Sequence, residues 1–212
     1  MHPSLPVLTL GLLLATVPPV GWNPARTPDV VYVATPQPAV DRMLDMAGVG
    51  PDDILYDLGS GDGRIPITAA RRWGTRGVGI ELKPDLVAQA DVAALRAGVA
   101  DKVRFQVGDI FEIDFSEATV VTLYLLPTLN LRLRDRLQAM KPGTRIVSHD
   151  YDMGSWEPDR VERVGNATLY LWVVREPDDC AWRQRDGGAT LACKPRAAGQ
   201  ALESPAPAQS DE

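Results

Sequence analysis

The sequence predicts an α/β fold: a Rossmann-like, doubly wound sheet of seven strands, mostly parallel, that ends in a C-terminal antiparallel hairpin. From residue 36 to residue 149, short apolar runs alternate with amphipathic segments of helical spacing, the order expected of parallel strands joined by right-handed crossovers. Residues 160–164 and 167–174 flank Gly165-Asn166, which is a hairpin signal. With 212 residues, 45% of them hydrophobic, the chain can bury one good-sized core.

The first half of the pattern begins with a helix and a strand. Residues 36–47 carry apolar side chains on one side of a predicted helix, and residues 53–57 form the apolar strand that follows. Residues 64–73 then form a helix that Gly74 can end. A second strand over residues 78–81 completes a strand–helix–strand unit.

The second half repeats this alternation. Residues 84–97 form a helix whose apolar stripe covers one face of the sheet, and residues 103–109 form the third strand. Residues 119–126 are apolar on both faces, as a central parallel strand is. A helix from residue 128 and a fifth strand over residues 145–149 lead to the closing hairpin.

The turn after the first strand, Asp57-Leu58-Gly59-Ser60-Gly61-Asp62-Gly63, suits a ligand held against bare backbone. Glycine reaches φ angles closed to other residues and leaves the space that a side chain would fill. The dinucleotide fingerprint needs Gly-x-Gly-x-x-Gly or Ala, but Arg64 and Pro66 stand where its last small residue would be. The pattern therefore disfavours a bound pyrophosphate and indicates S-adenosylmethionine, with an ordinary glycine-rich turn as the alternative.

Three acidic residues end three consecutive predicted strands and should face one crevice, because ligands of open α/β sheets collect at the carboxyl ends of the strands. Glu81 can accept hydrogen bonds from both ribose hydroxyls. Asp109 can accept one from the adenine amino group while the amide of Ile110 meets a ring nitrogen, and Asp57 lies nearest the cationic part of the ligand. Amides of residues 59–63 suit its carboxylate. The alternative for Asp57 and for Asp109 is that the side chain caps a turn and does not bind a ligand. The predicted cofactor-binding residues are Thr35, Asp57, Gly59, Ser60, Gly61, Asp62, Gly63, Glu81, Asp109 and Ile110.

Four segments carry a closer resemblance to a known family. They are Tyr32-Val33-Ala34-Thr35-Pro36, the glycine turn through Ile65, Gly79-Ile80-Glu81-Leu82-Lys83-Pro84, and Met140-Lys141-Pro142-Gly143-Thr144-Arg145-Ile146-Val147-Ser148. With them the chain resembles the class I, seven-stranded S-adenosylmethionine-dependent methyltransferases. More narrowly, it resembles prokaryotic relatives of the mitochondrial protein-lysine methyltransferases that act on the ATP synthase c subunit and the adenine nucleotide carrier. The resemblance covers about residues 31–174 and implies a protein substrate, membrane proteins included. Ala34 stands where the family commonly has proline.

Methyl transfer to lysine requires an aligned, neutral amine in a dry pocket. The catalytic candidates are Tyr124 and His149, with Tyr32, Asp150 and Tyr151 as further wall and positioning groups. Tyr124 could equally be a core aromatic residue. The alternatives to a protein-lysine methyltransferase are a small-molecule methyltransferase and a non-catalytic assembly factor that binds S-adenosylmethionine.

Nucleic acid and metal partners are not expected. The formal net charge is −6, whereas nucleic-acid binding normally shows as a basic face. Tyr124-Leu125-Leu126-Pro127 stands where amino-methylating nucleic-acid enzymes place Asn or Asp followed by Pro-Pro and an aromatic residue. Arg132, Arg134, Arg136 and Lys141 are expected to form a solvated face rather than a binding patch. No metal-ligand cluster appears, and two cysteines are too few for a zinc site.

The methyltransferase domain is expected over residues 31–176, between two segments of a different kind. Residues 1–30 include 11 mostly apolar residues, the length of a signal-peptide core, so that secretory signal, uncleaved anchor and misassigned start codon all stay open. Because cells make S-adenosylmethionine in the cytosol, we expect the domain on the cytoplasmic side, in association with the membrane. Residues 177–212 form an extension that should be disordered after about residue 195. Cys180 and Cys193 are expected as free thiols in a cytosolic tail, with a disulfide between them as the alternative if the domain meets an oxidising compartment.

Overall fold

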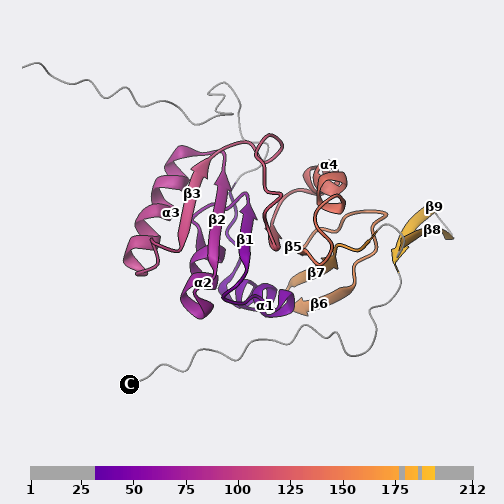
Figure 1. Cartoon of the computed structure of the whole chain (residues 1–212), viewed down its shortest axis with the longest axis horizontal. Coiled ribbons are helices and arrows are strands. Elements are labelled where there is room, and N and C mark those ends of the chain that lie inside the picture. The colour runs from indigo at the N-terminus through magenta and orange to yellow at the C-terminus, as the bar shows by residue number, and fades with distance from the viewer. Residues whose placement is uncertain (1–31, 177–179, 186–187, 194–212) are drawn as a thin grey trace, which may run out of the picture.

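The computed structural model describes residues 32–176, 180–185 and 188–193. The main sheet has seven strands in the order β3-β2-β1-β4-β5-β7-β6, and β8 pairs with β9 in a separate two-stranded sheet (Figure 1). The strands are β1 (Ile54–Leu58), β2 (Arg76–Glu81), β3 (Val103–Val107), β4 (Val120–Leu123), β5 (Arg145–His149), β6 (Arg160–Val164), β7 (Ala167–Val173), β8 (Cys180–Arg185) and β9 (Gly188–Cys193). The helices are α1 (Gln37–Ala47), α2 (Arg64–Trp73), α3 (Pro84–Arg96) and α4 (Pro127–Gln138).

The predicted fold class is confirmed. Strands β1 to β5 are parallel, and β7 runs antiparallel to both β5 and β6. The order reverses beside β1, where β2 and β4 lie on its two sides. A crevice is expected at such a point, outside the carboxyl ends of the strands.

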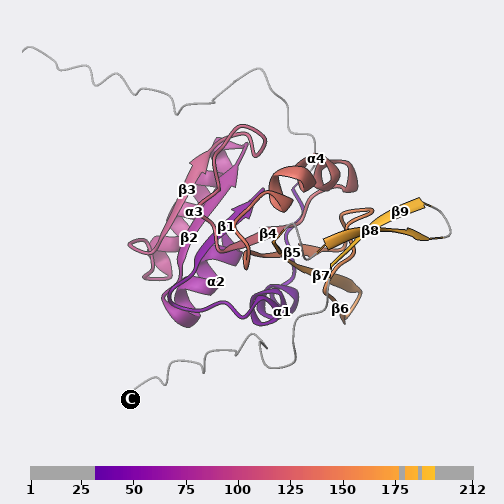
Figure 2. The ribbon, with the colours of Figure 1, turned by 45° about the vertical axis from the view of Figure 1, so that its right-hand side comes forward.

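Helices cover both faces of the sheet. Apolar side chains of α1 pack with Leu55, Val120 and Val147, which share one face. The apolar stripe of α4 packs on the other face, with Val121 and Leu123 among its neighbours. Figure 2 shows α1 and α4 on opposite sides of the central strands. This alternation along β4 is why the strand is buried throughout.

Several element ends differ from the predicted ones, most clearly around the fourth strand. The fourth strand stops at Leu123 rather than at residue 126, and α4 begins at Pro127. Because a proline disfavours helical backbone in the residue before it, Leu126 stays extended, at φ −63° and ψ 152°. Residues 124–126 therefore lie between the strand and the helix and belong to neither.

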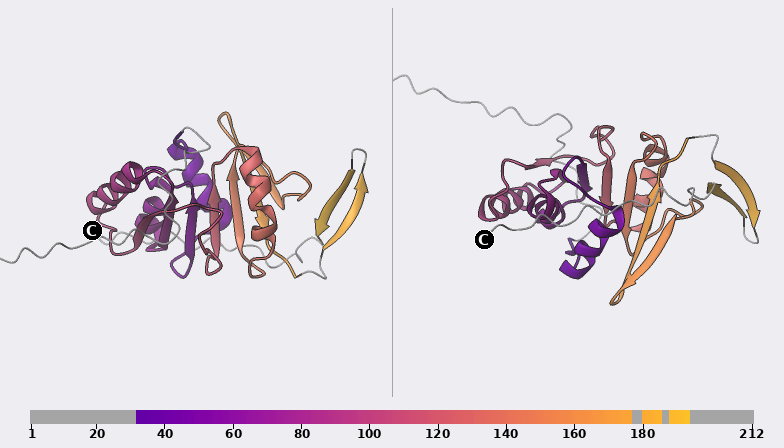
Figure 3. Two further views of the ribbon diagram at one scale, coloured as in Figure 1. Left: turned by 90° about the horizontal axis from the view of Figure 1, so that it is seen from above. Right: turned by 60° about the horizontal axis from the view of Figure 1, so that its bottom comes forward.

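The β8–β9 hairpin was not predicted. It lies at the end of the molecule opposite α3 (Figure 3), and the amide of Leu191 donates to the carbonyl of Ser155 at 2.9 Å. Cys180 is disulfide-bonded, and Cys193, which faces it in the strand register, is the only other cysteine of the chain. The expectation of free thiols is therefore wrong. The residues expected to be disordered after 195, and the hydrophobic segment 1–30, lie outside the described residues.

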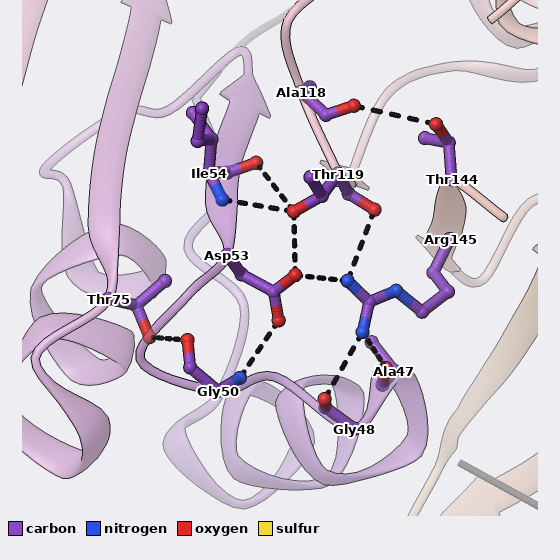
Figure 4. Close-up of polar contacts among 10 residues, drawn as sticks. All are labelled: Ala47, Gly48, Gly50, Asp53, Ile54, Thr75, Ala118, Thr119, Thr144 and Arg145. Carbon is purple, nitrogen blue, oxygen red and sulfur yellow. Dashed lines mark hydrogen bonds and ion pairs between the residues drawn. The ribbon is translucent and has the colours of Figure 1, made fainter. Parts of the chain in front are cut away.

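A buried ion pair joins the amino-terminal ends of three central strands (Figure 4). Asp53, directly before β1, pairs with Arg145, the first residue of β5, and their side chains are 13% and 12% exposed. The hydroxyl of Thr119, directly before β4, donates to Asp53 at 2.6 Å. The Arg145 guanidinium also donates to the carbonyls of Ala47 and Gly48, at the end of α1. These contacts fix the edge of the sheet that lies opposite the carboxyl ends of the strands.

None of the described helices could cross a bilayer, the longest having 13 residues.

Candidate active site

A cavity of about 890 Å³, counted out to its open mouth, lies at the carboxyl ends of β1, β2 and β4. Tyr124 and eight of the ten predicted cofactor-binding residues line it. These eight are Thr35, Asp57, Gly59, Ser60, Asp62, Glu81, Asp109 and Ile110. Gly61 and Gly63 belong to the same turn without lining the cavity. The structure thus brings the predicted acidic residues and the glycine turn to one crevice.

Asp57 is buried at the centre of this crevice. It is 3% exposed, and the hydroxyl of Thr122 on β4 donates to its carboxylate at 2.7 Å. The pKa of Asp57 is raised to about 7, chiefly by burial; the neighbouring charges of Glu81 and Asp62 add to this effect, and the Thr122 hydrogen bond opposes it. A cationic ligand would favour the ionised form of this carboxyl group.

Glu81 ends β2 and closes the next side of the cavity. One of its carboxylate oxygens accepts the amide of Gly61 at 3.0 Å, and the other accepts the amide of Lys83 at 2.9 Å. Each carboxylate oxygen has a second lone pair, so that Glu81 can still accept hydrogen bonds from two hydroxyls of a ligand. The same side chain therefore shapes the glycine turn and can bind a ribose.

The glycine turn holds itself together through its own amides. The amides of Gly59 and Ser60 donate to the carbonyl of Ile80, at 2.8 and 3.0 Å, and the amide of Gly63 donates to the carbonyl of Ser60 at 2.9 Å. With the Gly61 amide bound to Glu81, four of the five turn amides are engaged. The expectation that the turn amides bind the carboxylate of the ligand stays a prediction, and these four amides are engaged within the protein.

Arg64 contributes a positive charge to the lining of the cavity. Its guanidinium pairs with Asp62 at 2.7 Å and donates to the carbonyl of Thr35 at 2.9 Å. It lines the cavity and is one-third exposed. A cation at this place can bind the ligand's carboxylate. In the sequence, the only sign of this role was that Arg64 is the first residue of the helix after the glycine turn.

Residues 32–36, the leading segment, close the cavity from one side. A Cβ built on Gly61, where φ is 53°, would lie 2.1 Å from the ring of Tyr32, so only glycine lets the tyrosine lie on the turn. Thr35 is buried, and its hydroxyl lies 3.2 Å from Nδ1 of His149. The leading segment is thereby joined to both the glycine turn and the end of β5.

The catalytic candidates Tyr124 and His149 lie together, ring centroids 3.9 Å apart. Tyr124 lines the cavity, but the side chain of His149 is 3% exposed and lies behind that wall. Burial lowers the pKa of His149, and the charge of Asp150 opposes this effect. Tyr151 is nearly parallel to Tyr124, at a centroid distance of 6.4 Å. His149 is thus placed to position Tyr124 and Thr35 rather than to touch a substrate.

The expected solvated face on α4 is wrong for Arg136, which is partly buried, whereas Arg132 is exposed. Arg136 donates to the carbonyls of Ile110 and Ile113, at 3.0 and 2.6 Å, and Arg132 stacks on the ring of Phe111. These contacts hold the loop that carries the predicted adenine-binding residues. Only the fold shows them, because α4 and this loop are separated in the sequence by β4.

The residues of the cavity fit S-adenosylmethionine. The Ser60 hydroxyl is buried with no hydrogen-bond partner among the described residues. A Cβ built at Gly59 would lie 2.8 Å from the side chain of Leu125, so this position of the turn has room only for glycine. The carboxylate of Glu81 can accept hydrogen bonds from the ribose hydroxyls, and that of Asp57 lies where the cationic part of the ligand is expected. In the described ranges, no group of three or more His, Cys, Asp or Glu side chains could hold a metal ion.

Comparison with known proteins agrees with this geometry. The profile of the ANTKMT methyltransferase domain matches residues 57–160. A protein-lysine N-methyltransferase of Saccharolobus islandicus is 44% identical over 155 residues, which are 70% of this chain and 96% of that protein. The adenine nucleotide translocase lysine N-methyltransferase of Mus musculus is 36% identical over 68% of this chain and 62% of its own length.

One solved structure is also similar. It is described as an RNA methyltransferase from Salinibacter ruber in complex with S-adenosyl-L-homocysteine, is 59% identical, and matches with a TM-score of 0.67 over 68% of this chain and 95% of its own. A fold with this cavity, these motifs and these relatives leads to one conclusion. The chain is an S-adenosylmethionine-dependent methyltransferase and belongs to the family of the ANTKMT methyltransferase domain and the protein-lysine N-methyltransferases.

Proposed function

We propose that this methyltransferase modifies the ε-amino group of lysine in a protein substrate. The observation that carries the proposal is the 44% identity with an archaeal protein-lysine N-methyltransferase over 96% of that protein. Two relatives named for the adenine nucleotide translocase and the ATP synthase c subunit support it. Those two names favour a membrane protein as substrate.

Methyl transfer requires that the lysine nitrogen is aligned with the methyl group of the donor and that the amine is neutral. When bound, S-adenosylmethionine supplies an electrophilic methyl group on a sulfonium. The lysine nitrogen forms the new N–C bond with its lone pair as the S–C bond breaks, so it must first lose a proton. With an unperturbed pKa of about 10.4, only about one lysine in 2,500 is neutral at pH 7.

The wall beside Tyr124 favours that neutral form. Tyr124 and Tyr151 offer aromatic faces, next to the apolar side chains of Leu125 and Leu129 in the cavity lining. Partial removal from water lowers the pKa of an amine, and aromatic faces stabilise the cationic methylated product. The His149 ring keeps Tyr124 in place.

RNA is the second candidate substrate, because the similar Salinibacter structure is described as an RNA methyltransferase. The net charge of −6 opposes it, since RNA binding needs a basic surface. The segment Tyr124-Leu125-Leu126-Pro127 also offers no carboxylate or amide for a planar exocyclic amine.

A labelling experiment separates these substrates. The full-length protein is incubated with methyl-labelled S-adenosylmethionine and cell extract, divided into membrane and soluble fractions and treated with ribonuclease or protease. We expect label in a protein band of the membrane fraction, resistant to ribonuclease and located on lysine by mass spectrometry. Label lost with ribonuclease, or present only in small molecules, would refute the lysine proposal. Binding of the donor with no transfer to any fraction would instead support the non-catalytic assembly factor.

We also propose that the domain acts on the cytoplasmic side, where the methyl donor is made. The disulfide bond of Cys180 argues against this placement, because disulfides are rare in reducing compartments. Cells lysed directly into an alkylating reagent will decide: two alkylated cysteines support the cytoplasmic side, and a retained disulfide contradicts it.

A further inference from the structure

We propose that Asp150 binds the positively charged amine of the substrate at the mouth of the acceptor site. The inference rests on the proposed lysine methylation and assigns a substrate-binding residue to it. Asp150 follows β5 directly, at the same edge of the sheet as the cofactor residues, and it is next to His149, whose ring contacts Tyr124 on the cavity wall.

The backbone of Asp150 has an unusual and fixed conformation. With φ at 63°, it is the only non-glycine residue of the described chain in the left-handed region. Its amide donates to the carbonyl of Thr168 at 2.7 Å, and the amide of Thr168 donates back to the Asp150 carboxylate at 2.9 Å. Backbone strain of this kind persists where the surroundings hold it, and it is concentrated at functional sites.

The loop around Asp150 is held from a second side. Asn130 on α4 is fully buried, and its amide donates to the hydroxyl of Ser148 and to the carbonyl of Tyr151, at 3.1 and 3.0 Å. The Ser148 hydroxyl donates to the same carbonyl at 2.6 Å. The carboxylate of Asp150 and the ring of Tyr151 are therefore presented by a rigid loop, with little conformational entropy left to lose on binding.

The second carboxylate oxygen of Asp150 faces the ring of His149. It lies 3.5 Å from Nε2 of His149, and the side chain is one-third exposed. Within the described ranges, no lysine or arginine pairs with it, although most of the other described ion pairs use an arginine. A carboxylate beside two tyrosine rings has the features of a site for an organic cation.

The arrangement gives Asp150 one task. A lysine side chain that enters along Tyr124 and Tyr151 carries its charge until the proton leaves, and the carboxylate attracts that charge to the mouth of the site. Asn130 and Thr168 are positioning residues for Asp150. An uncharged base of a nucleic acid could donate a hydrogen bond to the same carboxylate but would lack the attraction between opposite charges.

Asp150→Asn tests the charge alone. Asparagine tolerates left-handed backbone and keeps an oxygen that can accept the Thr168 amide. The full-length protein is loaded with S-adenosylhomocysteine and titrated with 1-butylammonium chloride at constant ionic strength, while the tyrosine ring signals are followed by NMR. 1-Butanol is the uncharged control ligand. Asp152→Asn is the matched control variant, because Asp152 lies two residues away and accepts the amide of Gly154 instead.

We expect saturable binding of butylammonium, stronger than that of butanol. The affinity should fall about tenfold in Asp150→Asn, or about 1.4 kcal/mol, and stay within about twofold in Asp152→Asn. The affinity for S-adenosylhomocysteine should not change in either variant. If Asp150→Asn does not fold, Asp150→Gly suits the same backbone and should show the same loss.

Equal binding of butylammonium by Asp150→Asn and the unchanged protein would overturn the proposal, as would equal binding of butylammonium and butanol. Both results are independent of the labelling experiment. Lysine methylation can therefore fail while Asp150 binds an amine, and Asp150 can fail while lysine is still methylated.

Discussion

Raising the pH from 6 to 8 should strengthen the binding of S-adenosylmethionine about tenfold, through Asp57. Burial raises the pKa of this carboxyl group to about 7, whereas a cationic ligand favours its ionised form. The ionised fraction is about 9% at pH 6 and about 91% at pH 8. If only this form binds, the apparent Kd falls by the ratio of the two fractions, which is about ten, or about 1.4 kcal/mol.

Calorimetric titration at pH 6, 7 and 8 and constant ionic strength measures this effect. Asp57→Asn is the control, because it keeps an oxygen for the Thr122 hydrogen bond and cannot ionise. We expect the variant to bind with nearly the same Kd at all three pH values. The reasoning is refuted if the unchanged protein varies less than twofold, or if the variant keeps the tenfold change.

The same group should affect the stability of the ligand-free protein in the opposite direction. The ordinary pKa of 3.8 is raised to about 7 by folding, so between about pH 4 and pH 7 the folded protein holds a proton that the unfolded chain releases. The free energy of unfolding therefore falls across this window, by about 4 kcal/mol, and this contribution levels off above pH 7. Urea unfolding of the unchanged protein and Asp57→Asn should show that the variant lacks this decrease.

Four substitutions, one of them a control, test other parts of the structure. Glu81→Gln should weaken S-adenosylmethionine binding by about 1.5–3 kcal/mol, because it removes a charged acceptor; a calorimetric Kd within threefold of the original would contradict the assigned role. Gly61→Ala should abolish cofactor binding by displacing Tyr32, whereas Gly74→Ala, with a similar positive φ and no atom near the added Cβ, should cost only about 1–2 kcal/mol of stability and leave binding intact. Arg145→Met should lower the free energy of unfolding by about 3–5 kcal/mol without changing the Kd for the cofactor, and an unchanged unfolding midpoint would show that the buried ion pair contributes little.

The fold and the cofactor side of the site could be predicted because their signals are local. Helical and strand periodicity locate the elements, and the rule that ligands gather at the carboxyl ends of parallel strands places Asp57, Glu81 and Asp109 together. The spacing of the glycines in the turn after the first strand indicates S-adenosylmethionine rather than a dinucleotide as the ligand. Each of these inferences needs only residues close together in the sequence.

The acceptor side depends on contacts between distant segments, which spacing does not reveal. His149 is recognisable as the end of a strand, but only the packed structure shows that Tyr124 lies between it and the cavity. Arg136 reads as one of several exposed arginines until its hydrogen bonds to the loop after β3 are known. The turn amides were predicted to bind a ligand, yet most of them stabilise the turn.

The position of the Asp53–Arg145 pair bears on how such enzymes diversify. This ion pair and its hydrogen bonds lie where the strands begin, at the edge of the sheet opposite the cavity. Replacing side chains around the acceptor then changes which molecule is recognised while the scaffold keeps its cooperativity. The similar proteins include one named for protein lysine and one described as an RNA methyltransferase.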